Sequence, residues 1–224
     1  MARLKNEYEF MAGVHVDGEL YFNRFNLTID FYTLGDELLD QNIGIDRLTY
    51  FIYEVAARSV FVQEEDVKSI KAFASAGVPV LTVPSPGPFD PIVLAVLVTK
   101  MNAILEETLE ISDADLLTDI SGRLKYVWDS SDDEDEVHLI VNAEDEAKWW
   151  ASPSTRTTSY PAGTSVAEYE KSKPLQVTWE MLGLDWPSES EGEEETVVVK
   201  SSKKKDSTVI KADFNPAKPK KPEK

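Results

Sequence analysis

Cysteine is absent from this sequence of 224 residues, and histidine occurs only twice. Without cysteine the chain has no disulfide bond, no thiolate nucleophile, no cysteine-ligated iron–sulfur cluster and no cysteine-based zinc finger. His15 and His138 both lie in segments with the alternating pattern of β-strands, and no nucleophile motif accompanies them. Phosphate-binding loops, dinucleotide-binding glycine motifs, zinc-protease helices and kinase signatures are also missing. We therefore expect no cofactor and no metal site, and we favour a protein that is not an enzyme.

Long apolar segments are missing as well. The longest uninterrupted apolar run, residues 92–98, is far shorter than the roughly 20 residues that a membrane-spanning helix needs. Near the N-terminus, Asn6, Glu7 and Glu9 stand where a secretory signal would require apolar side chains. Together with the lack of cysteine, these features predict a cytoplasmic protein that does not contact a membrane.

Positive charge is scarce in most of the chain. The sequence has 23 lysines and arginines against 41 aspartates and glutamates, and its net charge is −18. From Thr196 onward, nine lysines against three acids give +6, and subtracting this from −18 leaves −24 for the preceding residues. A body this negative repels the phosphates of a nucleic acid. Any contact with nucleic acid is therefore expected through the C-terminal residues alone.

The C-terminal residues also differ from the rest in composition. Residues 188–195 contain only serine, glutamate and one glycine, and residues 196–224 are rich in lysine and proline. Such a segment buries too little apolar surface to offset the entropy that it would lose on ordering. We therefore predict a globular body (residues 1–186) and a disordered, acidic-then-basic tail (residues 187–224). The tail residues that we expect to contact a partner are Lys203, Lys204, Lys205, Lys218, Lys220 and Lys221.

The body has the pattern of an α+β fold, with N-terminal antiparallel strands, central buried helices, a second β-hairpin and short C-terminal helices. Asp17-Gly18, between two apolar segments, is typical of a type I′ hairpin turn. Alternation over residues 25–31 predicts a third strand. A helix is expected from Asp46 to about Val62, with Glu54 and Arg58 as an outward pair.

The middle of the body is predicted to be helical. A helix over about residues 64–76 should end at Gly77. Asp90 and Pro91 suit the N-cap and first turn of a helix that is apolar on every side for two turns, which should make it the central packed helix. Ser112 is expected to cap a further short helix.

A second hairpin is predicted from two alternating segments, residues 123–128 and 137–141. The acidic turn between them, residues 129–136, lacks the glycine and the ligand spacing of an EF-hand loop, so we expect a solvated turn and no calcium site. Short C-terminal helices are predicted over residues 144–150, after Ser165, and within residues 177–184.

Four tryptophans are candidate partner contacts. Trp149 and Trp150 are adjacent, so on a helix their side chains would diverge by about 100° and could not both lie at the centre of one buried stripe. One ring is therefore predicted at the surface, where tryptophan often marks an interface hot spot, unless a loop covers it. Trp179 and Trp186 belong to a short acidic amphipathic segment, which either lies in a partner's groove or packs on its own domain.

The leading functional hypothesis is non-catalytic protein–protein interaction, as an adaptor or assembly factor with an acidic body and a flexible basic tail. Small acidic accessory proteins of large assemblies, including viral particles, have this general character. Two alternatives remain open. One is a nucleic-acid-associated protein that binds through the lysine-rich tail. The other is a hydrolase that uses two carboxylates, which cannot be located by sequence among 41 acidic residues.

Overall fold

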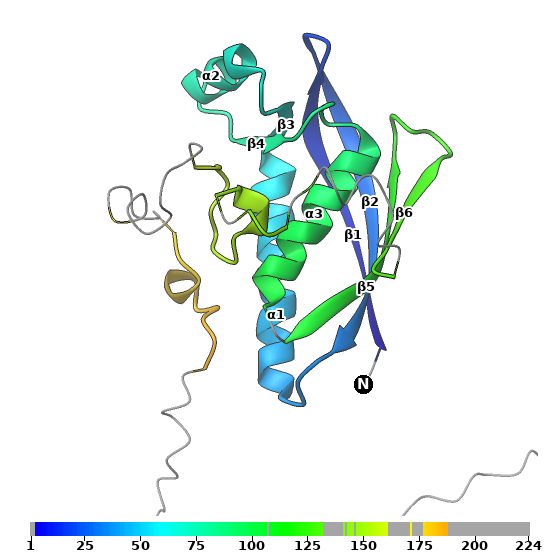
Figure 1. Ribbon diagram of the computed structural model, residues 1–224, viewed down its shortest axis with the longest axis vertical. Helices are drawn as coiled ribbons and strands as arrows, with labels where there is room; N and C mark the ends of the chain where they lie inside the picture. Colours follow the sequence, from blue (N-terminus) through cyan, green and yellow to red (C-terminus); the bar gives the residue numbers. More distant parts are fainter. Residues whose placement is uncertain are drawn as a thin grey trace, which may run out of the picture. The chain divides into compact units, whose positions relative to one another are not determined.

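The fold was examined in a computed structural model (Figure 1). It describes residues 3–106, 108–131, 141, 143–145, 147–160, 171 and 177–187. The chain divides into two units, Met1–Pro187 and Ser188–Lys224, and all the described residues belong to the first. The six tail lysines, His138 and the helix predicted after Ser165 therefore lie outside the described residues.

A six-stranded mixed sheet in the order β4-β3-β1-β2-β5-β6 forms the centre of the fold, so the predicted α+β class is confirmed. Strands β1, β2, β5 and β6 pair antiparallel, whereas β3 and β4 add to β1 in parallel. The strands are β1 (Arg3–Val16), β2 (Glu19–Thr33), β3 (Val60–Gln63), β4 (Val80–Val83), β5 (Leu109–Thr118) and β6 (Lys125–Asp129).

Strands β1 and β2 form one long hairpin that turns at Asp17-Gly18. Both turn residues have positive φ, 53° and 83°, as a type I′ turn requires, so this prediction is confirmed. The predicted third strand over residues 25–31 is wrong, because β2 runs through these residues without a break. Alternate side chains of both strands are buried and form the sheet's contribution to the core.

Helices α1 (Leu38–Tyr50) and α3 (Asp90–Leu105) pack side by side against this buried face (Figure 1). The start of α1 predicted at Asp46 is wrong, because the helix begins at Leu38. The end predicted at Val62 is also wrong, because the β-branched run from Val60 continues as strand β3.

Two irregular turns connect α1 to β3. A π-helical turn, Phe51–Val55, is followed by a 3-10 turn, Ala56–Arg58. The predicted pair of Glu54 and Arg58 is formed there, with 2.6 Å between its charged atoms. It lies on the surface, where such a pair adds little stability.

Helix α3 is the central packed helix, as predicted. Its residues are buried on almost every side, and Pro91 occupies its first turn. The predicted N-cap is wrong, because Phe89 precedes the helix and the carboxylate of Asp90 instead accepts a hydrogen bond from Thr118 Oγ1 at 2.5 Å. No helix among the described residues combines the length and the apolar character that crossing a membrane would require.

The helix predicted to begin at Ser112 is wrong, because this residue lies within strand β5. A register shift opposite Asp30 and Phe31 interrupts the alternation, so that Ile111 and Ser112 are both buried. Such a bulge hides the period of two on which strand prediction depends. The second hairpin is formed by β5 and β6, so residues 123–128 pair with β5. Most of the predicted partner, residues 137–141, lies outside the described residues.

Helix α2 (Val67–Ser75) lies at the end of the sheet that carries the β1–β2 turn (Figure 1). Asp66 caps it by accepting a hydrogen bond from the backbone N–H of Ser69 at 3.1 Å. Gly77 follows with φ 73°, so the predicted C-terminal glycine is confirmed.

Beyond β6 the described residues contain two short 3-10 turns, Trp149–Ala151 and Glu180–Leu182. The helices predicted over residues 144–150 and 177–184 are therefore wrong. Their backbone is held by buried side chains of α1 and α3 and not by continuous helical hydrogen bonds.

Candidate interaction surface

Both adjacent tryptophans lie in the core. Trp149 and Trp150 are 0% and 1% exposed, and their rings meet edge to face. The indole N–H of Trp149 donates to the carbonyl oxygen of Thr82 in β4 at 2.8 Å, and its ring contacts Phe51. The expectation that one ring lies at the surface is wrong, because a single 3-10 turn with extended flanks does not impose the side-chain directions of an α-helix. Neither ring is accessible to a partner in this structure.

A buried lysine holds the segment that carries these tryptophans. Lys100 of α3 is 1% exposed, and its Nζ donates to the carbonyl oxygens of Trp149, Ser152 and Ser154 at 3.1, 2.7 and 2.7 Å. Burial lowers the pKa of Lys100 well below its usual value, and the charge of Arg156 lowers it further, while the three oxygens oppose the shift by replacing water around the ammonium.

A buried amine with a lowered pKa is sometimes a catalytic nucleophile. In this case all three N–H directions of Lys100 are occupied by backbone carbonyls, and its side chain is almost wholly enclosed. We therefore assign Lys100 a structural role. The lysine within an otherwise apolar helix was the signal in the sequence that could have revealed this contact.

The last described segment packs on its own domain and not in a partner's groove. Arg47 of α1 is 1% exposed, and its Nε donates to the carbonyl oxygen of Leu184 at 2.7 Å. Its guanidinium lies over the rings of Trp186 and Trp179, at 3.8 and 5.1 Å from their centres. The N–H of Trp179 donates to the carbonyl oxygen of Pro153 at 2.8 Å. Both tryptophans are therefore used in anchoring this segment.

His15 pairs with a carboxylate, but the surroundings are those of a structural contact. Its Nδ1 lies 3.4 Å from Asp66 Oδ2, and its ring meets Phe73 edge to face at 5.5 Å. Hydrogen bonds from the side chain and backbone of Ser69 lower the pKa of Asp66, because they stabilise its charged form. The pair attaches the start of α2 to β1. Among the described residues no cluster of histidine and acidic side chains is placed to hold a metal ion.

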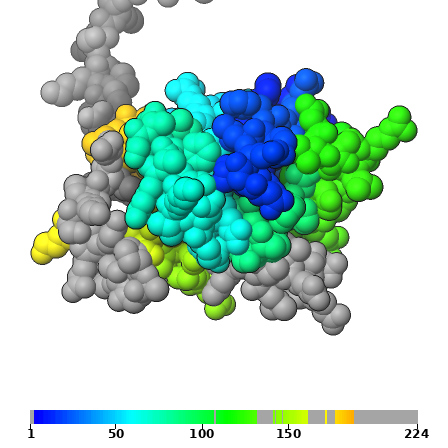
Figure 2. All heavy atoms as spheres, turned by 90° about the horizontal axis from the view of Figure 1, so that it is seen from above, coloured from blue at the N-terminus to red at the C-terminus, as the bar shows by residue number. Residues whose placement is uncertain are grey.

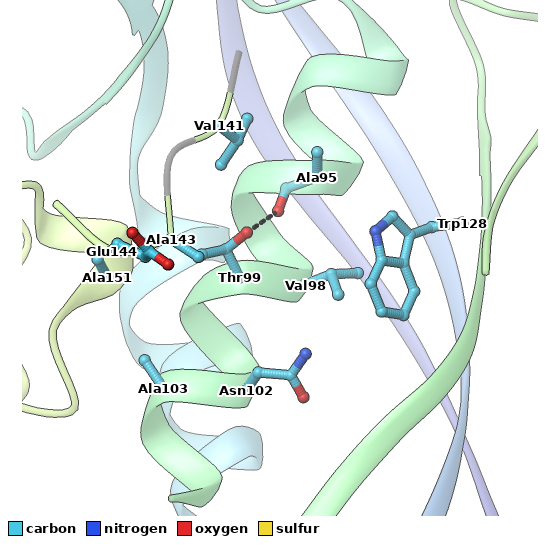
Figure 3. Close-up of a pocket in the computed structure, with 10 residues that line it drawn as sticks. All are labelled: Ala95, Val98, Thr99, Asn102, Ala103, Trp128, Val141, Ala143, Glu144 and Ala151. Atoms are coloured by element: carbon cyan, nitrogen blue, oxygen red, sulfur yellow. Dashed lines mark hydrogen bonds between the residues drawn. The ribbon is translucent and has the colours of Figure 1, made fainter. Parts of the chain in front are cut away.

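A pocket of about 700 Å³ lies on the outer side of α3 (Figure 3). Small side chains and Trp128 form most of its wall. Of its polar side chains, Thr99 donates to the carbonyl oxygen of Ala95 at 2.8 Å, and Asn102 Oδ1 accepts from the N–H of Ile111 at 3.1 Å. Glu144 is the one carboxylate among the residues that line it. Carboxylate hydrolysis needs two acidic groups facing each other, so these lining residues do not supply that chemistry.

An apolar groove of about 420 Å³ lies at the N-terminal end of α3, beside the β1–β2 turn. We call it the hairpin-end groove. Figure 2 looks onto this end, where the tip of the β1–β2 hairpin (blue) lies between the segment that contains α2 (teal) and the segment around β5 and β6 (green). The apolar and aromatic side chains that line the groove are Val14, Val16, Tyr21, Phe89, Ile120 and Tyr126.

The folded elements position these side chains firmly. Val14 and Tyr21 are cross-strand partners at the end of the hairpin, beyond the reach of the helices. Phe89 is the last residue before α3 and is 47% exposed. Buried Asn23 fixes the opposite wall, because its Oδ1 accepts a hydrogen bond from the N–H of Ile120 at 3.1 Å.

Negative charge surrounds the groove. Asp90 belongs to its lining, and the hydroxyl of Tyr21 donates to the carboxylate of Glu19. This hydrogen bond is the main reason that the pKa of Tyr21 is raised. The groove therefore combines exposed apolar side chains with an acidic rim, an arrangement that suits binding and contains no nucleophile paired with a base. No feature of the sequence examined alone brought these residues together.

Comparison of the sequence with protein-family models gave no matching model, and comparison with curated proteins gave no match. The function is therefore argued from the geometry of the described residues.

Proposed function

We propose that this chain is a non-catalytic interaction protein, an adaptor or assembly factor, and that a partner protein binds in the hairpin-end groove. The observation that supports this most is the gathering of half-exposed aromatic and aliphatic side chains around one groove. Tyr21, Phe89 and Ile120 are 43%, 47% and 57% exposed. An apolar patch of this kind rimmed by polar groups is typical of a protein–protein contact.

The support beneath the groove favours the same function. Its side chains come from the ends of β1 and β2, the start of α3 and the connection between β5 and β6, all of which are fixed by the core. A surface that is already ordered loses little conformational entropy when a partner binds. The proposal keeps the cytoplasmic location predicted from the lack of cysteine.

Affinity purification with quantitative mass spectrometry tests the proposal in cells that produce the protein. We expect Phe89→Ala to reduce recovery of a specific partner by about tenfold or more, because a truncated hot-spot aromatic costs upward of 1.4 kcal/mol. Phe22→Ala is the matched control. Phe22 follows Tyr21 and is 74% exposed, but adjacent side chains of a strand point to opposite faces, so it lies outside the groove.

Three outcomes would contradict the proposal. Equal recovery of all partners by both variants would show that the groove is not the binding surface. Loss of every partner after nuclease treatment would favour the nucleic-acid alternative, in which the lysine-rich tail binds. Hydrolytic activity that survives Phe89→Ala and depends on a carboxylate would favour the enzyme.

A further inference from the structure

We propose that the hairpin-end groove binds the basic, proline-rich residues 216–222 of a second copy of this chain, which joins copies head to tail. This inference rests on the proposed function and names the partner. It follows from the chemistry of the groove, the sequence of these residues and the place where the described chain ends.

The groove has the chemistry that recognises extended proline-rich segments. Such segments dock in grooves lined by aromatic side chains, because a polyproline II helix is ordered before binding and presents flat pyrrolidine rings. Tyr21, Phe89 and Tyr126 supply aromatic rings from three different parts of the fold. Asp90 and Glu19 place carboxylates beside them, which favours a ligand with positive charge.

The sequence of the chain contains a ligand of this type. Pro216, Pro219 and Pro222 are spaced three residues apart. A polyproline II helix has three residues per turn, so prolines at this spacing lie on one face. Three lysines, Lys218, Lys220 and Lys221, fall between the prolines and occupy the other faces. One face would contact the aromatic rings while the lysines meet the acidic rim.

The geometry of the described chain favours a second copy as the source. Trp186 and Pro187 lie beside Glu106 and Thr108, at the C-terminal end of α3, whereas the groove lies at its N-terminal end. A helix of 16 residues separates these two places by about 24 Å. A docking site at one end and a chain exit at the other is the arrangement that builds head-to-tail contacts.

Electrostatic repulsion also favours a second copy. The five glutamates of residues 188–195 directly follow a body with a net charge of −24, which is the −18 of the chain less the +6 from Thr196 onward. Like charges repel, so this acidic stretch is directed away from the body that carries it. The basic residues beyond it can then meet the acidic rim of another copy.

Peptide binding tests the ligand. A fluorescein-labelled peptide of residues 213–224 is titrated into the full-length chain carrying Pro216→Ala, Pro219→Ala and Pro222→Ala, and fluorescence anisotropy is measured. We expect saturable binding that Phe89→Ala weakens about tenfold or more and Phe22→Ala leaves unchanged. A peptide with alanine at the three proline positions keeps its charge and should bind about tenfold more weakly. Equal binding of both peptides, or of both groove variants, would overturn the proposal.

Sedimentation velocity of the unmodified chain tests the source. We expect the mean mass to rise with protein concentration, and to remain that of a monomer in the triple proline variant and in Phe89→Ala. Peptide binding together with a monomer at every concentration would show that a second copy is not the occupant. Circular dichroism confirms that Phe89→Ala is folded, which is expected because the side chain is half exposed.

The two proposals can fail separately. If the peptide does not bind but partner recovery still depends on Phe89, the groove remains an interaction surface and only its assigned occupant is wrong.

Discussion

The segment that packs on α1 and α3 and the hairpin end of the sheet satisfy their aromatic side chains in different ways. In the first region, buried cations fix the backbone, and the rings of Trp149, Trp150 and Trp179 are enclosed. In the second, Tyr21 and Phe89 remain half exposed although the elements that carry them are ordered. The difference teaches that an aromatic residue marks an interaction surface only where its own domain leaves it uncovered.

The largest effect is expected from the buried lysine. Lys100→Ala removes the donor of three buried carbonyl oxygens and leaves a cavity, so the free energy of unfolding should fall by about 3 kcal/mol. Chemical denaturation measures this change. Lys71→Ala, at an exposed position of α2, is the control and should change stability by less than about 0.5 kcal/mol. A similar small loss for Lys100→Ala would show that the lysine does not hold the segment.

Arg47→Met should have the next largest effect, with a loss of about 2 kcal/mol, because it removes the bond to Leu184 and the contact with two tryptophan rings. Amide hydrogen exchange should increase in residues 177–187 before it increases elsewhere. Arg58→Met, which removes a surface pair, should leave that exchange unchanged. Unaltered protection in the Arg47 variant would contradict the anchoring role.

A smaller effect should appear as a dependence of stability on pH. The folded pKa of Lys100 is lower than its unfolded value, so between these two pKa values the unfolded chain binds one more proton. This group therefore makes the folded state more stable as pH rises toward 10.5, and the cost of its burial is fully present below the folded pKa. The stability of the wild type relative to Lys100→Met should increase between neutral and alkaline pH. A constant difference would show that the pKa is not lowered.

The smallest change in stability is expected in the groove. Phe89→Ala and Phe22→Ala should each lower the free energy of unfolding by less than about 1 kcal/mol, because both rings are largely exposed. Thermal unfolding measures this. A large loss for Phe89→Ala alone would mean that its ring belongs to the core, which would remove the distinction between the two regions.

Local patterns predicted several parts of the fold well. Asp17-Gly18, Gly77 and the apolar helix after Pro91 stand where the sequence placed them, because turn chemistry and continuous apolarity act over a few residues. Predictions failed where distant contacts decide. The bulge that buries Ser112 depends on its pairing with β2, and the position of both adjacent tryptophans depends on α3 and β4.

The candidate site could not be predicted for the same reason. Tyr21, Phe89 and Ile120 are separated by long stretches of sequence, and each alone resembles an ordinary core residue. Only the meeting of the hairpin end, the start of α3 and the connection to β6 brings them to one groove. No local period connects them.

The sequence by itself determined the absence of cysteine chemistry, the division of charge between body and C-terminal residues, the hairpin turn and the apolarity of the central helix. These properties depend on composition or on neighbours within a few residues. The tertiary structure alone decided which tryptophans are enclosed, that Lys100 and Arg47 anchor the last described segments, and that an apolar groove stays open. Burial is a property of all the elements packed around a side chain, and no single segment specifies it.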